Sequence, residues 1–187
     1  MKNRTFVPCI VTIIFAILLG VTFFLPLAVA NDEYSELIRG YSTETAIAEC
    51  DYSYGDLVNI SMFEFANIYK VGTTLDEAGS YGKTESVICF VIIIAVALFT
   101  LLTLLFSLLK KPVPLIIFNL LALGAFSLLM WDMGDRKVLP SSQYNFGIAH
   151  ILYYICFTAL LAGGIWLLVG KISDKRNGKK NDVETEM

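Results

Sequence analysis

Four long apolar blocks, separated by polar segments, most constrain how this chain can fold. They cover residues 6–30, 87–109, 113–131 and 147–170, so that each contains 19 to 25 residues. A helix of such a length is about 28–37 Å long, which is enough to cross a hydrocarbon core roughly 30 Å thick. Backbone groups inside lipid have no water to bond, so spanning segments of this kind must be helical. The pattern predicts an all-α membrane protein built as a four-helix transmembrane bundle.

The first block also has the features of a secretory signal peptide. Lys2 and Arg4 precede it, and it ends in Ala28-Val29-Ala30, small residues of the kind found at signal-peptidase sites. Its apolar run exceeds twenty residues, whereas the apolar region of a signal peptide has about 7–15. We therefore expect residues 1–30 to be retained as an N-terminal tail and first transmembrane helix, with cleavage after Ala30 as the alternative.

The distribution of basic residues predicts the orientation of the helices. Nine Lys and Arg residues lie in the N-terminal tail, at Lys110-Lys111 and after Gly170, whereas five lie in the longer segments on the opposite side. Short basic segments stay on the cytoplasmic side of a membrane. We therefore expect a multi-pass protein of the plasma (cytoplasmic) membrane with both termini in the cytosol. The polar residues 171–187 then form a disordered cytosolic tail.

The opposite side holds an acidic extracytoplasmic cap at 31–86 and a short outer loop at 132–146. The cap carries eleven Asp and Glu residues against three Lys and Arg residues, a composition typical of a solvated surface. A short hairpin is expected over 46–60, with Tyr54-Gly55-Asp56 at its turn. The residues between Thr73 and Thr84, rich in Gly and Thr, are expected to connect the cap to the second transmembrane helix.

A short amphipathic helix is predicted in the middle of the cap. Ser61 and Glu64 have the spacing of a capping box, in which each side chain bonds the backbone N–H of the other residue. Gly72 is expected to end this helix in the left-handed conformation. Most of the helix surface is apolar, and its candidate interaction residues are Met62, Phe63, Phe65, Ile68 and Tyr69. Because so short and apolar a helix is not stable alone in water, it must pack over the bundle, lie on the membrane interface or bind a partner, and packing over the bundle is favoured.

Small residues predict which transmembrane helices approach most closely. Ala16 and Gly20 in the first helix are four residues apart, as are Ala159 and Gly163 in the fourth. Such pairs allow two helix backbones to come close within lipid, where the hydrophobic effect gives no attraction between helices. We expect the first and fourth helices to touch along these faces, with Gly20 near Gly163.

Polar residues are rare inside the predicted helices. No ionisable residue lies near the middle of any block, and Asn119 is the one strongly polar interior side chain. At the outer level, Asp132, Asp135 and the single histidine, His150, form a candidate polar cluster. A structural contact of His150 with a carboxylate or the backbone is expected there, and metal binding or pH sensing is the alternative.

The chain lacks the residue patterns of known catalytic and cofactor sites. It has one histidine, no two cysteines separated by two residues and no glycine-rich phosphate loop, so neither a zinc site nor a nucleotide site is predicted. No nucleophile-elbow motif accompanies His150. A net charge of −3 gives no support for nucleic-acid binding. We expect no cofactor, no metal and no enzymatic activity.

Two functional hypotheses remain. The first is a non-enzymatic accessory or assembly subunit in the lipid bilayer whose cap contacts a protein partner. The second is a small ligand or ion sensor, or a permease component, that uses the acidic cap and the polar residues Asp132 and His150 at the outer ends of the helices. A homo-oligomer is compatible with either, and Cys50, the one cysteine outside the four blocks, could bridge two copies.

Overall fold

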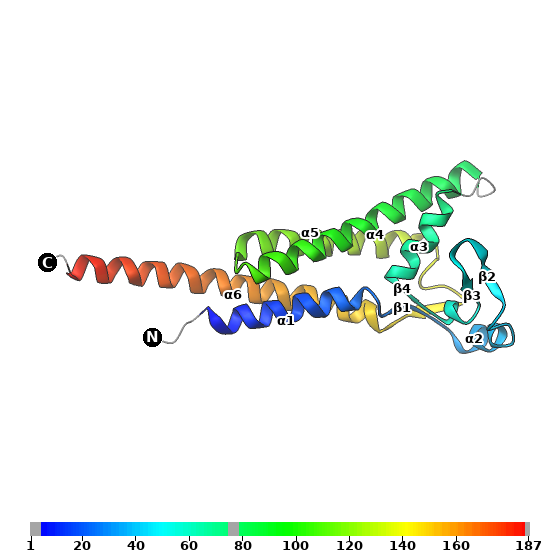
Figure 1. Ribbon diagram of the computed structural model, residues 1–187, viewed down its shortest axis with the longest axis horizontal. Coiled ribbons are helices and arrows are strands. Elements are labelled where there is room, and N and C mark those ends of the chain that lie inside the picture. Colours follow the sequence, from blue (N-terminus) through cyan, green and yellow to red (C-terminus); the bar gives the residue numbers. More distant parts are fainter. Residues whose placement is uncertain (1–4, 75–78, 186–187) are drawn as a thin grey trace.

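The computed structural model describes residues 5–74 and 79–185. The molecule is elongated: long helices run along its length, and the strands gather at one end (Figure 1). Both chain termini lie at the opposite end. The part at the strand end, formed by residues 23–74 and 136–147, is called the head below.

Three helices are long and apolar enough to cross a membrane: α4 (Gly79–Leu108), α5 (Pro112–Asp135) and α6 (Ile148–Thr185). They make the chain a multi-pass membrane protein. Helices α4 and α5 form a hairpin, in which Lys110 takes a positive φ of 54°. Pro112 stands at the first position of α5, where a helix loses no hydrogen bond to proline.

The first apolar block does not form one helix. Helix α1 covers only Phe6–Thr22, and residues Pro26–Ala30 form strand β1. The prediction of a helix up to Ala30 is therefore wrong at its end. Pro26 lacks the N–H that a continuing helix needs, and the residues after it pair with strands of the head. Helix α1 packs against α6 and α4, and its 17 residues are about 25 Å long.

The head is organised around a three-stranded sheet in the order β4-β1-β5. Strand β1 pairs antiparallel with β4 (Asn59–Ser61) on one side and with β5 (Tyr144–Phe146) on the other. Gly147 follows β5, and its N–H donates to the Leu27 carbonyl at 2.7 Å. The predicted cap and the predicted short outer loop are thus parts of one structure.

Two predictions about local structure in the head need correction. A hairpin does form, from β2 (Thr45–Ile47) and β3 (Tyr52–Ser53), but residues 48–51 connect its strands, with Asp51 at a φ of 57°. The expected turn at 54–56 instead lies after β3. The connector predicted up to Thr84 is also too long, because α4 already begins at Gly79.

The predicted amphipathic helix is α3 (Met62–Gly72), and its capping box is confirmed. The Ser61 N–H donates to Glu64 Oε2 at 2.6 Å, and the Glu64 N–H donates to Ser61 Oγ at 3.2 Å. The predicted end is wrong: Gly72 belongs to the helix, and Thr73 follows it in the right-handed conformation. The Thr73 N–H bonds the Tyr69 carbonyl, so no left-handed residue is needed.

The chain after Lys171 was predicted to be disordered, but α6 continues as a helix to Thr185. This part projects beyond the other helices at the end where the termini lie (Figure 1). Extending an existing helix adds one hydrogen bond per residue and avoids the cost of nucleation, which explains why the polar sequence remains helical.

One continuous core joins the helices to the head. Its fully buried members include Leu19 of α1, Leu27 of β1, Met62 of α3 and Tyr153 of α6. The Tyr153 hydroxyl donates to the Met62 sulfur at 3.6 Å. The head therefore packs on the helix ends and does not fold around a separate core of its own.

Candidate functional site

The outermost part of the head is a strongly acidic surface, which we call the acidic tip (residues 31–58). It consists of α2 (Asp32–Arg39), the β2–β3 hairpin and two short 3₁₀ helices, η1 (Ala48–Cys50) and η2 (Asp56–Val58). Its charged side chains are all exposed, and Arg39 is the single cation among seven carboxylates: Asp32, Glu33, Glu36, Glu44, Glu49, Asp51 and Asp56.

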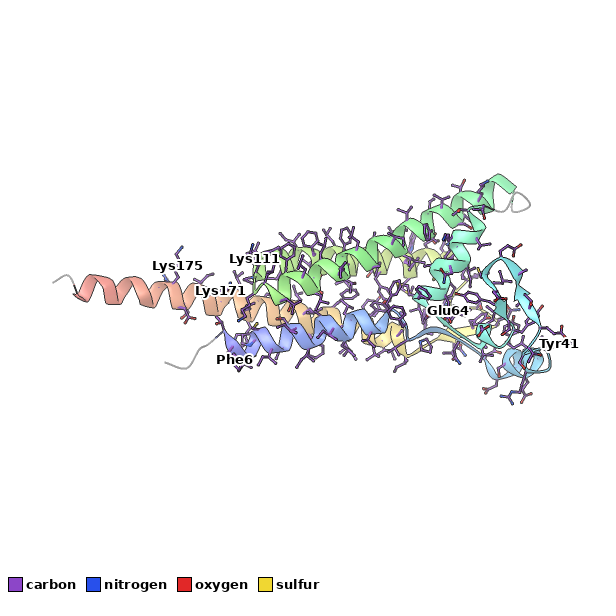
Figure 2. All side chains as sticks on the ribbon, viewed as in Figure 1. Phe6, Tyr41, Glu64, Lys111, Lys171 and Lys175 are labelled. Carbon is purple, nitrogen blue, oxygen red and sulfur yellow. The ribbon has the colours of Figure 1, made fainter. Side chains whose placement is uncertain are left out.

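Two large apolar side chains stand among these carboxylates. Leu37 is 66% exposed and Tyr41 is 54% exposed, whereas Ile38 between them is buried. Figure 2 shows Tyr41 at the extreme end of the molecule, opposite to Lys171 and Lys175. The tip thus combines negative charge with exposed apolar area, far from the apolar surface of the long helices.

The tip is fixed to the rest of the head by Asn31. Its side chain accepts a hydrogen bond from the Tyr34 N–H at 2.8 Å, which caps α2. Its Nδ2 donates to the Ser142 carbonyl at 2.5 Å, and its N–H donates to the Gln143 carbonyl at 2.8 Å. One residue therefore both starts α2 and joins it to the segment before β5.

Tyr144 makes a second connection to the tip. Its hydroxyl donates to the Leu57 carbonyl at 2.9 Å, and its ring lies 5.4 Å from that of Tyr34. Burial, together with the neighbouring Tyr34 hydroxyl, raises the pKa of Tyr144 far above its ordinary value. The hydroxyl therefore stays protonated at physiological pH and keeps its role as a donor.

Asp56 organises the turn after β3. Its Oδ2 accepts from the Ser53 hydroxyl at 2.7 Å and from the Ser53 N–H at 2.9 Å. These two hydrogen bonds favour the ionised carboxylate and lower the pKa of Asp56. This carboxylate shapes the tip in addition to giving it charge.

The helix proposed as an interaction surface is largely covered by the chain itself. Met62 and Phe65 are buried, Ile68 and Tyr69 are half-buried, and only Phe63 is exposed. The reason is the packing of α3 against α4 and the sheet, which is the favoured alternative of the sequence analysis. A partner therefore meets Phe63 alone on this surface.

A polar cluster that the sequence did not reveal lies where α3, α4 and α5 meet. Arg136, the residue that follows α5, forms an ion pair with Asp132 in the last turn of that helix, and its Nη1 lies 3.3 Å from Glu85 of α4. It also donates to the sulfur of Cys89 at 2.6 Å, and the Cys89 thiol donates to Asp132 at 3.1 Å. Tyr69 lies beside Cys89, and burial raises the pKa of the Tyr69 hydroxyl well above its ordinary value. The i,i+4 spacing of Asp132 and Arg136 was the one feature of the sequence that pointed to this cluster.

The structure does not bring the predicted polar cluster together. Asp132 bonds Arg136 and Cys89, whereas the contacts of His150 are with aromatic rings. The imidazole stacks on Phe146 with ring centroids 4.1 Å apart and lies 5.3 Å from Tyr154. Asp135 is exposed to solvent. Across residues 5–74 and 79–185, no group of three His, Cys, Asp or Glu side chains is arranged to hold a metal ion.

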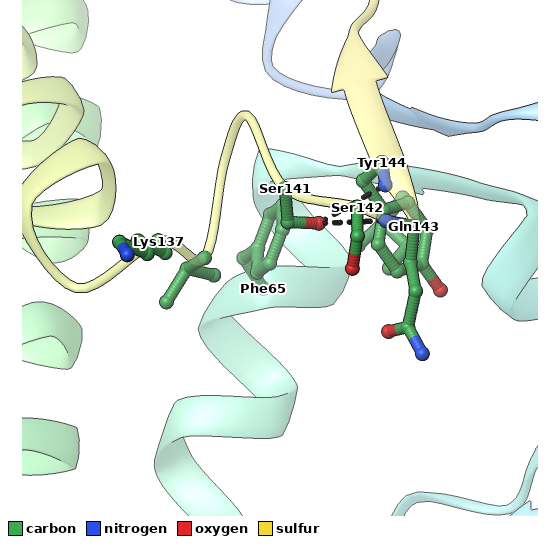
Figure 3. Close-up of a pocket in the computed structure, with 8 residues that line it drawn as sticks. Phe65, Lys137, Ser141, Ser142, Gln143 and Tyr144 are labelled. Atoms are coloured by element: carbon green, nitrogen blue, oxygen red, sulfur yellow. Dashed lines mark hydrogen bonds between the residues drawn. The ribbon is translucent and has the colours of Figure 1, made fainter.

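A cavity of 390 Å³ lies between α3 and the segment that precedes β5 (Figure 3). Its walls are apolar at Phe65 and Val138 and polar at Ser142 and Gln143. Lys137 lines the rim, with its ammonium turned away from the other labelled side chains in this view. The Ser141 hydroxyl accepts from the N–H groups of Gln143 and Tyr144, which fixes the wall of the cavity.

The predicted contact between the first and last long helices exists, but its register differs from the expectation. Ala16 is fully buried, and α1 packs along α6. At Gly163, however, a Cβ atom would meet the Thr12 methyl group at 2.8 Å, whereas nothing lies within 4 Å of such an atom at Gly20. Gly163 therefore allows Thr12, and not Gly20, to approach; Ala159 is half-buried.

Comparisons with known proteins identify no relative. No protein-family model matches the chain, and neither a curated protein nor a solved structure matches it. Functional conclusions therefore rest on the geometry described above.

Proposed function

We propose that this chain is a non-enzymatic accessory or assembly subunit that presents the acidic tip to a protein partner outside the cytoplasm. The observation that carries this proposal is the exposure of Leu37 and Tyr41 among seven carboxylates. Exposed apolar area surrounded by charged residues is typical of protein interaction sites. Since α3 is largely covered by the chain itself, the tip is favoured over α3 as the binding surface.

The charge of the tip indicates the chemistry of the partner. A basic surface with an apolar recess complements the carboxylates and accepts Tyr41, a side-chain type enriched among the residues that anchor interfaces, with Leu37 beside it. Two copies of the tip carry the same negative charge and repel each other. A heterologous partner is therefore favoured over a homodimer formed through this surface.

The proposed orientation places α1 as the fourth helix of a transmembrane bundle, with both termini in the cytosol. Lys111, Lys171 and Lys175 lie on the side of the molecule opposite the tip (Figure 2), and Lys171 donates to the Lys110 carbonyl at 2.5 Å. A concentration of lysine at one end supports a cytosolic location for that end. The tip then faces the extracytoplasmic side of the plasma membrane.

The test is recovery of the partner from native membranes in mild detergent, followed by mass spectrometry. Wild type is compared with the double variant Leu37→Ser/Tyr41→Ser and with Ile172→Ser, which changes an equally exposed residue outside the head. We expect one stoichiometric partner with wild type and Ile172→Ser, and at least about tenfold less with the tip variant, as hot-spot losses of this kind produce. Equal recovery with all three proteins would show that the tip is not the binding surface.

A second candidate is a small-ligand sensor, and the cavity beside Phe65 and Gln143 is the observation in its favour. Its volume of 390 Å³ lies within the range of small-molecule sites, about 300–1,000 Å³. Thermal unfolding with a panel of small organic acids, and with Gln143→Leu as the comparison, tests this candidate. A stabilisation that disappears in Gln143→Leu would support it, and an unchanged melting temperature with every compound would remove it.

A further inference from the structure

A row of exposed apolar side chains follows one face of α1 toward the head. Ile10, Ile14, Ile17 and Val21 are all exposed, and their spacing of three or four residues places them on one side of the helix. In a membrane-embedded chain, such a face is in contact with lipid. The row marks the lipid-facing side of α1 along its whole length.

Phe24 continues this row beyond the last residue of α1. Phe23 keeps a helical conformation, and the Phe24 N–H donates to the Val21 carbonyl at 3.0 Å. The backbone therefore keeps turning, and Phe24 emerges three residues after Val21 on the same face. Its side chain is 65% exposed.

Phe63 transfers the apolar row from α1 to the head. Its ring centroid lies 5.6 Å from that of Phe24, and its N–H donates to the Phe23 carbonyl at 3.2 Å. The side chain is 46% exposed, while Met62 before it and Phe65 two residues after it are buried. Phe63 is thus the apolar residue of α3 that faces outward where the head meets the bundle.

The surroundings of Phe63 suit a lipid environment. The neighbouring Glu64 is half-buried, and its carboxylate is held by the Ser61 N–H in the capping box. No charged residue occurs from Thr5 to Ala30, and Glu64 is the one charged residue in the first turn of α3. Phenylalanine, with Trp and Leu, is typical of the apolar faces that surface-bound helices bury at the boundary of headgroups and acyl chains.

We propose that Phe24 and Phe63 insert together into the bilayer interface next to the head and anchor the head to the membrane surface. The occupant of this surface is lipid, because the pair is continuous with the lipid-facing row of α1. Insertion of these two side chains fixes the start of α3 at the membrane surface. The acidic tip is then held away from the membrane, where a partner reaches it. This proposal rests on the membrane embedding of the helices and not on the proposed partner.

The proposal is tested with a bimane fluorophore on single introduced cysteines in reconstituted vesicles. The background is Cys50→Ser, because the other three cysteines are buried. Probes on Phe63→Cys and Phe24→Cys are compared with one on Leu37→Cys, a similarly exposed apolar residue on the tip. Quenching by phosphatidylcholine spin-labelled near its headgroup and quenching by aqueous iodide are measured for each.

We expect the lipid quencher to act several-fold more strongly on the Phe63 and Phe24 probes than on the Leu37 probe, and iodide to show the reverse order. Strong iodide quenching of the Phe63 probe without lipid quenching would overturn the proposal. Protection of this probe from both quenchers would also overturn it, because protein would then cover the site.

A conservative variant keeps the test independent of folding defects. Phe63→Trp retains an aromatic ring, and with Trp131→Phe and Trp166→Phe it carries the only indole of the chain. Its emission in vesicles should be blue-shifted and quenched by brominated phosphatidylcholine. Red-shifted emission that brominated lipid leaves unchanged would contradict insertion in a protein with a wild-type circular dichroism spectrum.

Discussion

Arg136 Nη1 lies 3.3 Å from the carboxylate of Glu85, which ties the end of α5 to the start of α4 at the base of the head. The same guanidinium pairs with Asp132 and bonds the sulfur of Cys89. Both carboxylate side chains are mostly covered, with 28% and 27% exposed. One cation therefore compensates two partly desolvated anions.

Removal of this cation should destabilise the junction of α4 and α5. In Arg136→Ala, the carboxylates of Glu85 and Asp132 lose their cationic partner, and the free energy of unfolding should fall by roughly 1–3 kcal/mol. The value is below that of a fully buried pair, because water reaches part of each carboxylate. Thermal unfolding in detergent measures the loss, and Lys137→Ala, at an exposed neighbouring residue, should change little. Equal melting temperatures for both variants would mean that the ion pairs contribute nothing.

Gly147→Ala should disrupt the connection between β5 and β1. A Cβ atom at this position would overlap the Pro26 carbonyl oxygen and lie 2.7 Å from its carbon, and backbone atoms have little freedom to move away. We expect a loss of about 1–3 kcal/mol and faster protease cleavage within the head. Gly20→Ala is the matched control, since nothing lies within 4 Å there. Wild-type protease resistance in Gly147→Ala would show that the sheet tolerates a shift of this strand.

The pKa of Asp56 predicts the pH at which the turn after β3 loosens. The pKa is lower in the folded protein than in the unfolded chain, so the ionised group contributes stability above the unfolded value, about 3.9. This contribution is lost as the pH falls through the folded pKa. Hydrogen exchange of peptides covering 50–58, corrected for intrinsic rates, should be unchanged from neutral pH to about pH 5 and should rise only in stronger acid. In Asp56→Asn the exchange should already be faster at neutral pH. A rise near neutral pH in wild type would assign the effect to another group.

Cys50 offers a direct test of the proposed orientation. It is half-buried, and its Sγ donates to the Asn67 carbonyl at 3.6 Å. Burial and the adjacent Glu49 raise its pKa, so a membrane-impermeant maleimide should label it slowly near neutral pH and faster as the pH rises. Intact cells should be labelled in wild type but not in Cys50→Ser. Labelling only after permeabilisation would place the tip in the cytosol.

The packing of α1 on α6 predicts which engineered cysteines form a disulfide. Thr12→Cys combined with Gly163→Cys removes the methyl group that lies 2.8 Å from the Cβ position of residue 163, so the two thiols should cross-link under mild oxidation. Gly20→Cys combined with Gly163→Cys should not, because the helices place these residues at different levels. Cross-linking of the second pair alone would contradict the described register.

Some features of this protein follow from interactions between residues close in sequence, and the sequence alone determined them. Apolar length identified α4, α5 and α6, since a long apolar segment must satisfy its backbone within one helix. The capping box of Ser61 and Glu64 involves residues three apart and is as predicted. Charge composition identified the acidic segment that becomes the tip, because charged side chains remain solvated wherever the backbone goes.

Only the tertiary structure decided the end of the first helix, the sheet and the polar cluster. Residues 26–30 are as apolar as the helix before them, and their partners lie near residues 60 and 145, beyond the reach of any local pattern. Burial of Met62 and Phe65 likewise depends on where α4 and the sheet pass. Arg136 meets Glu85 only because the α4–α5 hairpin brings residues 51 positions apart together. Periodicity and capping report local energies, whereas strand pairing and ion pairing depend on which distant segments meet.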